Sequence, residues 1–367
     1  MADKTFNVRI KCKRDTESNW QTANPVLKSG ELAVSELSEN KVKLKAGDGA
    51  KSYSLLPFIS TRTDDLLETG EMHNGIFRGA DLTSVYNPTQ LHEKMSSGDF
   101  SNLYLGDYFR MGSSTLTLYI KFAGEAFESG VTYYERSGTY PNWTYTATSD
   151  TVYDSAKTYY TKSVTQVAES SVNMMIADFD YYYNVGDQTA SLVNYHHIVL
   201  VPQTKMSVDA PMNPTRIVSG GYYGSEMHQT TLPCYYQFLK TGIPQDYLKT
   251  WRDRLSSGVN TNYASMAGAN LKGAVSANTW QTTSIRLMSE EMLFGGRIFS
   301  SSALDVGCAN RQLSVFKFIS PVKYGRDAFW TSAVASSERF SYITNAGLSH
   351  YQNADSPSGV RPLVIFG

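Results

Sequence analysis

Short segments in which apolar and polar residues alternate constrain the fold of this chain more than any other feature. Phe6, Val8 and Ile10 alternate with polar neighbours, and so do Leu32 and Val34. Successive side chains of a β-strand point to opposite faces of a sheet, so a period of two indicates a strand with one buried face. Turn-forming Asn, Gly, Pro and Asp residues separate many of these segments. The pattern predicts a protein built from many short strands.

The aromatic content supports the same conclusion. The 367 residues include 25 Tyr, 16 Phe and 5 Trp, and aromatic side chains fit the pleated, half-buried surface of a sheet. Apolar residues make up 41% of the chain, which is enough for a packed core. We therefore expect a mainly β fold with a few short helices, of the α+β class.

Three helices are predicted between the strands. Residues 87–98 begin with an Asn-Pro-Thr-Gln capping box and end at a glycine. Residues 289–295 begin with Ser-Glu-Glu and also end at a glycine. In residues 244–258, Tyr247 and Trp251 belong to a series of large apolar residues spaced by four, which predicts a helix with one apolar face.

The order of these segments predicts two units and one insertion. Residues 1–60 are expected to form a small β-meander, and residues 61–75 are polar and are expected to form a linker. Residues 76–367 form the second unit. Within it, residues 125–165 contain an internal repeat and are predicted to form an aromatic-rich β-hairpin insertion.

The repeat aligns residues 128–137 with residues 154–163, and each copy carries a Tyr-Tyr pair. Flat aromatic faces stack on the apolar faces of sugar rings, and phenol hydroxyls bond to sugar hydroxyls. The alternative is that half of each pair packs a small core, because alternate side chains of a strand face inward. The candidate contact residues of the insertion are Tyr133, Tyr134, Trp143, Tyr145, Tyr159 and Tyr160.

A second group of candidate contacts lies near the C-terminus. Residues 341–358 combine aromatic residues with Asn, Ser and Gly, a mixture typical of binding loops, and we expect an exposed loop there. A plain surface loop without a ligand is the alternative. The candidates in this third of the chain are Trp330, Tyr342, Asn345, His350, Tyr351 and Asn353.

Charge and cysteine usage exclude several classes of function. The formal net charge is −1, whereas nucleic acid and anionic membranes attract basic surfaces. Neither a membrane-spanning segment nor a signal peptide is expected, because the apolar runs are short and none follows the N-terminus. The spacing of Cys12, Cys234 and Cys308 fits neither a metal site nor a disulfide framework. We expect no metal and no cofactor.

Catalysis is not expected either, although one pair of carboxylates needs consideration. Asp178 and Asp180 alternate on a predicted strand, so both could face one side, and paired carboxylates can hydrolyse glycosides. His196 and His197 are neighbours, so one is expected to be buried and the other to lie at the surface. The alternatives to a non-catalytic binding protein are a glycan depolymerase that uses the two aspartates and a purely structural component.

Short motifs recur through the first sixty residues. They are Val8-Arg9-Ile10, Arg14-Asp15, Trp20, Asn24-Pro25-Val26-Leu27, Gly30-Glu31-Leu32, Lys43-Leu44, Gly47-Asp48-Gly49 and Leu56-Pro57. On these motifs the segment resembles the N-terminal module of bacteriophage tail fibres, including the major tropism determinant family.

A second set of motifs lies in the rest of the chain. It consists of Ile176-Ala177-Asp178-Phe179-Asp180-Tyr181, His196-His197, Gly220-Gly221-Tyr222, Leu287-Met288-Ser289-Glu290, Arg311-Gln312, Phe329-Trp330 and Gly359-Val360-Arg361-Pro362. On these motifs the remainder is similar to the C-type-lectin-like receptor-binding region of such proteins.

The resemblance implies a homotrimeric receptor-binding protein of the virion, located at the distal tail or baseplate and made in the host cytoplasm. Its N-terminal module would attach it to other tail or baseplate proteins or begin the trimer. Its C-terminal region would face a glycan or protein of the host surface. The Glu-Pro-Asn and Gln-Pro-Asp triplets of calcium-dependent lectins do not occur in the sequence, so recognition would use side chains directly.

Overall fold

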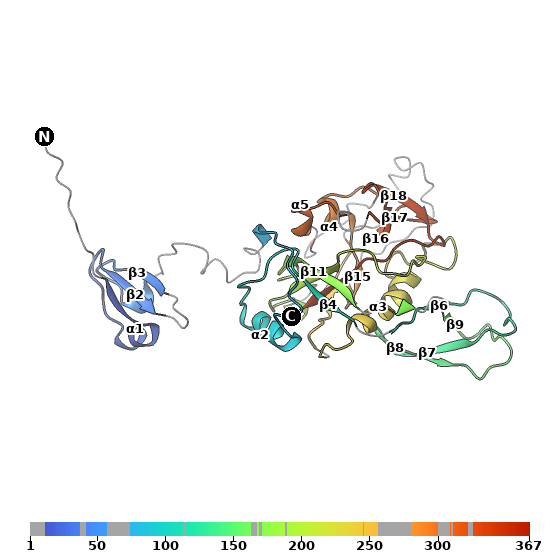
Figure 1. The fold of residues 1–367 in the computed structure, drawn as a ribbon, viewed down its shortest axis with the longest axis horizontal. Coiled ribbons are helices and arrows are strands. Elements are labelled where there is room, and N and C mark those ends of the chain that lie inside the picture. Colours follow the sequence, from blue (N-terminus) through green and yellow to red (C-terminus); the bar gives the residue numbers. More distant parts are fainter. Residues whose placement is uncertain are drawn as a thin grey trace. The chain divides into compact units, whose positions relative to one another are not determined.

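The computed structural model divides the chain into two compact units, residues 1–68 and residues 69–367. It describes residues 12–36, 42–56, 74–112, 115–162, 167–168, 171–187, 189–244, 246–255, 280–299, 309, 311–321 and 326–367. The strand predicted at residues 6–10 lies outside these ranges, as does most of the predicted linker, residues 61–75. The fold is mainly β with a few short helices, as predicted (Figure 1).

The smaller unit is not a meander. Its strands β1 (Lys13–Thr16) and β2 (Leu32–Glu36) run parallel, and β3 (Val42–Ala46) pairs antiparallel with β2. Helix α1 (Glu17–Ala23) makes the connection that parallel strands require. The sequence prediction missed α1 because this helix has seven residues and buries only one of them, Trp20, so it shows no apolar period.

A small aromatic core holds this unit together. Trp20 stacks on Tyr53 of the 3₁₀-helix η1 (Tyr53–Leu55), with ring centroids 5.1 Å apart. Gly47 lies against the backbone of the segment before β2, where an added Cβ would be 2.3 Å from the Lys28 carbonyl oxygen. Only glycine fits at this position, which explains one residue of the Gly-Asp-Gly motif.

The larger unit is built on a five-stranded antiparallel sheet in the order β15-β19-β12-β11-β4. Its strands are β4 (Tyr108–Met111), β11 (Val172–Phe179), β12 (Ile198–Pro202), β15 (Arg286–Leu287) and β19 (Pro362–Phe366). Strands β12 and β19 are apolar throughout, β11 contains the apolar run Met174–Ala177, and two separate cores bury the two faces of these strands. Val364 faces one core and its neighbour Ile365 faces the other.

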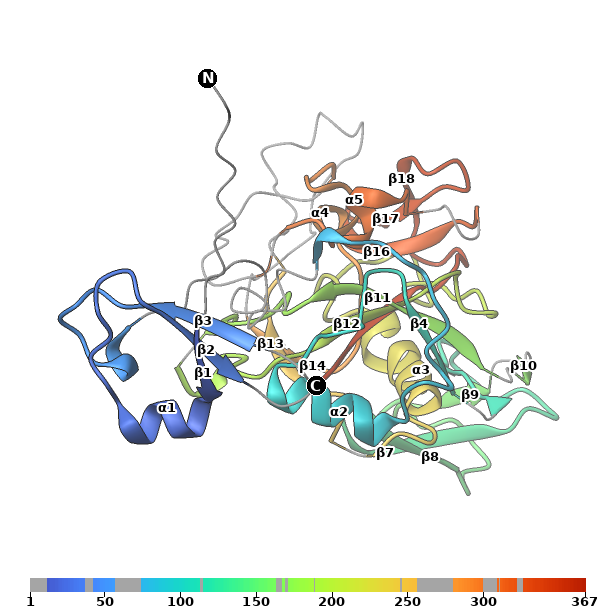
Figure 2. The same ribbon diagram turned by 60° about the vertical axis from the view of Figure 1, so that its left-hand side comes forward.

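Helices cover both faces of this sheet. Residues of α2 (Pro88–Ser97) and α3 (Leu232–Leu239) belong to one core, and residues of α4 (Glu290–Phe294) and α5 (Val315–Phe318) belong to the other. Figure 2 shows the two pairs of helices on opposite sides of the sheet. None of the helices in the described part of the chain has the length and apolar character needed to span a bilayer.

Two of the three predicted helices are confirmed. Both halves of the capping box form at the start of α2, and a Ser289 cap begins α4. The helix predicted at residues 244–258 is wrong, because Trp251 lies in β13 (Trp251–Asp253), which pairs with β14 (Gln281–Thr283). Both end residues of β13 are buried, so tertiary packing and not the four-residue spacing decides the conformation.

The C-terminal region contains a hairpin where a loop was expected. Strands β16 (Phe329–Val334), β17 (Arg339–Ile343) and β18 (Ser349–Asn353) form an antiparallel sheet. The predicted loop, residues 341–358, therefore consists largely of β17, β18 and a short turn. The remaining short elements are β5 (Thr115–Leu116), β10 (Val167–Ala168), the 3₁₀-helix η3 (Thr189–Ser191) and the π-helix η4 (Met227–Thr231).

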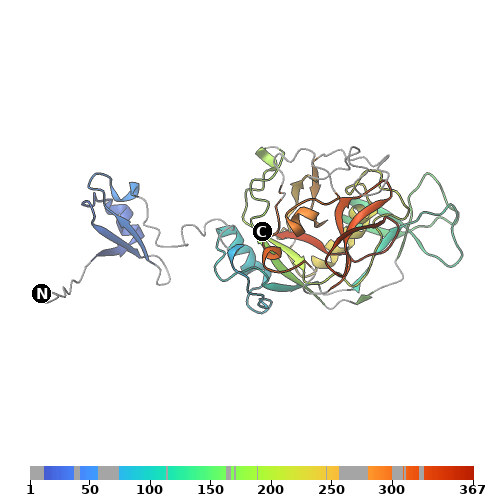
Figure 3. The ribbon, with the colours of Figure 1, turned by 90° about the horizontal axis from the view of Figure 1, so that it is seen from above.

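The insertion forms a four-stranded antiparallel sheet, here called the insertion sheet, in the order β6-β9-β7-β8. Its strands are β6 (Tyr119–Lys121), β7 (Tyr133–Thr139), β8 (Asn142–Ala147) and β9 (Tyr160–Lys162), so it begins before the predicted residue 125. Figures 1 and 3 both place it at the end of the larger unit away from α2.

Truncation of Ile365 tests the role of the central sheet. Ile365 is fully buried in β19, so Ile365→Ala should lower the free energy of unfolding by about 2–5 kcal/mol through lost burial and the resulting cavity. Urea denaturation of the full-length protein measures this change. Ile217→Ala is the matched control, because Ile217 is 53% exposed and its truncation should cost less than about 0.5 kcal/mol. Equal losses in the two variants would contradict the assigned core.

Candidate ligand-binding site

The first tyrosine of each repeat packs on one face of the insertion sheet. Tyr133 stacks on Phe127 with ring centroids 4.1 Å apart, and Tyr159 meets Phe127 edge-on at 4.8 Å. With Phe122 and Tyr153 these side chains form a cluster that we call the mini-core. Tyr133 and Tyr159 are buried. Their prediction as contact residues is therefore corrected, and the packing alternative holds for both.

The second tyrosine of each repeat lies in a separate aromatic layer. Tyr134 and Tyr160 are cross-strand partners, so the two copies of the repeat pair with each other. Tyr119 stacks on Tyr145 with ring centroids 3.8 Å apart and meets Tyr134 edge-on at 5.3 Å. Tyr160 is buried against the Tyr145 ring and the Arg136 guanidinium. Tyr160 thus supports this layer and does not present a free face.

Hydrogen bonds to η4 hold this layer against the rest of the unit. The Trp143 indole Nε1 donates to the Gln229 carbonyl oxygen at 2.9 Å. Arg136 Nη1 donates to the same oxygen at 3.1 Å and to Thr230 Oγ1 at 3.0 Å. The Arg136 guanidinium also lies over the Trp143 ring, 4.3 Å from its centroid. The orientation of Trp143 is therefore fixed in the absence of a ligand.

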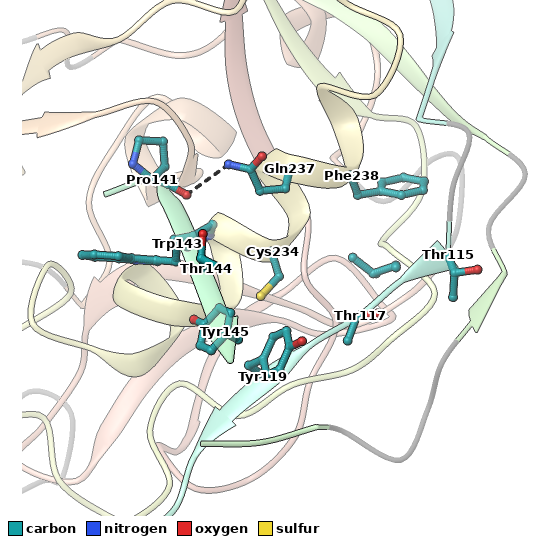
Figure 4. Close-up of a pocket in the computed structure, with 12 residues that line it drawn as sticks. Thr115, Thr117, Tyr119, Pro141, Trp143, Thr144, Tyr145, Cys234, Gln237 and Phe238 are labelled. Carbon is teal, nitrogen blue, oxygen red and sulfur yellow. Dashed lines mark hydrogen bonds between the residues drawn. The ribbon is translucent and has the colours of Figure 1, made fainter. Parts of the chain in front are cut away.

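A pocket of about 360 Å³ lies between β8, α3 and residues 115–119. Figure 4 shows side chains of β8 and α3 converging on it. We call it the aromatic pocket. The lining residues that bear on binding are Tyr119, Trp143, Thr144, Tyr145, Cys234 and Gln237. Two of the predicted contact residues, Trp143 and Tyr145, are among them, and both are half-buried.

The polar groups of this pocket suit a neutral, hydroxyl-rich ligand. The Tyr145 hydroxyl is buried and has no hydrogen-bond partner in the described part of the chain. Burial raises the pKa of this phenol, so it remains a donor at neutral pH. The Gln237 amide donates to Asn142 Oδ1 at 2.7 Å, which fixes its position on the pocket wall. Burial also raises the pKa of the Cys234 thiol to about 11, so it is not a thiolate at neutral pH.

The C-terminal candidates form a second, separate patch on the β17–β18 hairpin. Tyr342 and His350 are cross-strand partners, and the His350 and Tyr351 rings stack at 4.8 Å. Asn345 is exposed in the turn, and Asn353 accepts a hydrogen bond from Arg339 at 3.2 Å. Figures 1 and 2 both show this hairpin well apart from β7 and β8. The two groups of candidates therefore do not form one site.

Trp330 belongs to neither patch. It is fully buried in β16, and its indole Nε1 donates to the Ala210 carbonyl oxygen at 2.8 Å. Its prediction as a contact residue is therefore corrected. The sequence alone could not separate Trp330 from an exposed aromatic, because both kinds of residue occur on strands.

The two aspartates have separate surroundings and separate partners. A bulge in β11 separates Ile176 from Asp178 in the strand register, and Asp180 lies beyond the end of the strand. Asp178 accepts two hydrogen bonds from Arg311, both of 2.7 Å. Asp180 accepts from the backbone N–H of His197 at 2.8 Å and lies 2.7 Å from His196 Nδ1. Each carboxylate has its own cationic or histidine partner, which is the arrangement of a structural group.

The histidine prediction is confirmed. His197 is fully buried, and its Nε2 accepts the Tyr182 backbone N–H at 3.1 Å. The His196 side chain is 26% exposed.

Tyr119 and Gln237 line the aromatic pocket but are not among the residues that the sequence singles out. Leu116 and Leu118 belong to a segment in which apolar residues alternate, so Tyr119 is expected on the opposite face from them. This alternation could have identified Tyr119 as a candidate lining residue. Gln237 lies in α3, a helix that the sequence analysis missed, and no local pattern marks its contact with β8.

Comparison with known proteins adds no assignment. No family model, curated protein or solved structure matches this chain.

Replacement of Asp178 tests its structural role. Asp178 is fully buried and also accepts the Ser314 backbone N–H at 2.8 Å. Asp178→Ala leaves these donors and the Arg311 charge without their acceptor and should lower the free energy of unfolding by about 3 kcal/mol. Chemical denaturation measures the change. The control is Asp209→Ala, which removes a surface ion pair with Lys205 and should cost less than about 1 kcal/mol. A fully stable Asp178→Ala protein would contradict the structural role of this carboxylate.

Proposed function

We propose that this chain is a non-catalytic receptor-binding protein of a bacteriophage tail, and that its aromatic pocket holds a saccharide of the host surface. The observation that supports a saccharide ligand is that Trp143, Tyr145 and Gln237 line the same open pocket (Figure 4). Saccharide sites combine an aromatic face with a few fixed polar groups. The Thr144 hydroxyl and the Gln237 amide line the same pocket and give such a ligand polar groups to bond.

The chemistry of the pocket favours binding over turnover. Of the described residues that line it, none is a carboxylate or a histidine, and its thiol is protonated at neutral pH. Glycoside hydrolysis needs two carboxyl groups that flank the bond to be broken. The aspartates that the depolymerase hypothesis requires are bound to Arg311 and His196. These contacts support the non-catalytic assignment.

The viral assignment rests on the sequence resemblance to tail-fibre modules. In this proposal, residues 76–367 adopt a C-type-lectin-like fold, and residues 1–60 attach the protein to the tail. The protein assembles as a homotrimer at the distal end of the tail. A trimer would present three copies of the aromatic pocket. Once one copy has bound a saccharide, the other two copies meet neighbouring saccharides at a high effective concentration. The overall affinity for a cell surface would then exceed the affinity of a single pocket.

Substitution of Trp143 tests the proposed contact. Trp143→Ala removes the aromatic face and should weaken binding of the fluorescently labelled full-length protein to intact host-candidate bacteria by about tenfold or more. Trp143→Phe keeps a ring at this position and should retain part of the binding. Flow cytometry measures the affinity, and light scattering with thermal unfolding verifies assembly and folding.

Tyr351→Ala is the matched control, because Tyr351 is a half-buried aromatic of the separate hairpin patch. Loss of binding in Tyr351→Ala with full binding in Trp143→Ala would move the contact to the hairpin. If the assembled wild-type protein binds no candidate host, the receptor-binding proposal fails and a structural tail component replaces it.

A further inference from the structure

A second pocket, of about 450 Å³, lies between the insertion sheet and the segment that leads into η4. We call it the charged pocket. Its lining is mainly polar and includes Lys121, Glu135, Arg136, Lys157, Tyr160 and Glu226. Arg136 connects it to the aromatic pocket, because the guanidinium lies over the ring of Trp143, which lines the latter.

Two of the charges in this pocket neutralise each other. Lys157 Nζ lies 3.5 Å from Glu135 Oε1 and 2.7 Å from Asp150 Oδ2. Glu135 Oε1 also accepts the Thr148 hydroxyl at 2.6 Å. The charges of Lys157 and Glu135 are therefore already paired within the protein. The remaining charged residues of the pocket lining are Lys121, Arg136 and Glu226.

The carboxyl group of Glu226 is poorly solvated and incompletely bonded. Its Oε1 atom is buried without a hydrogen-bond partner in the described part of the chain. Burial raises the pKa of Glu226 above its ordinary value of 4.5, although a hydrogen bond with Thr230 and the charges of Arg136 and Lys121 oppose the shift. Among the remaining charges of the pocket, the two cations outnumber this one carboxylate.

The local backbone holds the cation in place. Arg136 is bonded to Gln229 and Thr230 of η4, and Gln229 also lines the charged pocket. A π-helix is rare, and such turns occur frequently at functional sites. A guanidinium carries five N–H donors in a planar fork that matches a carboxylate. Its anchoring through Nη1 and its stacking on two rings fix the plane of this fork.

From these contacts we infer that the charged pocket binds the carboxylate of an acidic sugar, with Arg136 and Lys121 as the cationic partners. This inference rests on the proposed function, because the aromatic pocket would hold a neighbouring part of the same saccharide. Glu226 is the one carboxylate beside these two cations, so its charge opposes the bound carboxylate.

The inference predicts a pH dependence with a definite sign. When Glu226 loses its proton, its negative charge repels the bound carboxylate, so affinity for an acidic sugar should fall as pH rises through the raised pKa of Glu226. The other titratable groups that act on this carboxyl are Lys121, Arg136, Tyr160 and Cys234. The Tyr160 phenol and the Cys234 thiol stay neutral at neutral pH, since burial raises the pKa of both. Glu226 is therefore the group that switches.

The test compares a uronic-acid oligosaccharide with its carboxyl-reduced, neutral counterpart by calorimetric titration of the full-length protein. The wild type should bind the acidic form about tenfold more tightly, and Lys121→Met should remove most of this preference. Glu226→Gln should abolish the pH dependence between pH 4.5 and 8 while the preference remains. Lys317→Met, which removes an exposed lysine of α5, is the matched control and should bind as the wild type does.

The outcomes separate the two proposals. Equal binding of the acidic and neutral forms, with both lost in Trp143→Ala, overturns the charged subsite and leaves the aromatic pocket as the saccharide site. A stronger preference for sulfated or phosphorylated sugars than for uronic acids overturns the carboxylate assignment. A properly assembled wild type that binds neither oligosaccharides nor cells overturns both the inference and the proposed function.

Discussion

The carbonyl oxygen of Gln229 joins two strands of the insertion sheet to the body of the larger unit. It accepts hydrogen bonds from Trp143 and Arg136, and both donors lie on strands of the insertion. One donor lines the aromatic pocket and the other lines the charged pocket. The position of both pockets therefore depends on the same short segment, η4. A shift of this segment would move the Trp143 ring and the Arg136 guanidinium together, so the two proposed subsites would change position together.

Most of the architecture follows from local patterns in the sequence. The apolar runs of β11, β12 and β19 identify the buried central strands, and the Asn-Pro-Thr-Gln signal identifies α2 because every element of its capping box is local. The errors have long-range causes. The spacing around Trp251 fits a helix, but β14 provides a partner strand that no local rule anticipates. The parallel pairing of β1 with β2 is likewise set by tertiary contacts.

The candidate site was predictable to a smaller degree. The repeat identifies the insertion as an aromatic sheet, and the segment between its two copies contains Trp143 and Tyr145, which line the pocket. It does not reveal which tyrosine of each pair faces inward, because this depends on which loops and helices cover each face. Gln237 and Glu226 come from segments about 90 residues away in sequence. Such residues can be assigned to a site only when the fold brings them together.

The alternation of the two aromatic layers has a consequence for how this surface can change. The mini-core, with Phe127, Tyr133 and Tyr159, lies on one face of the insertion sheet, whereas Trp143 and Tyr145 lie on the other. Residues that stabilise the insertion and residues that line its pocket are thus interleaved in sequence but separated in space. Under the proposed function, selection can alter the specificity of the second set one strand position at a time while the first set keeps the insertion folded.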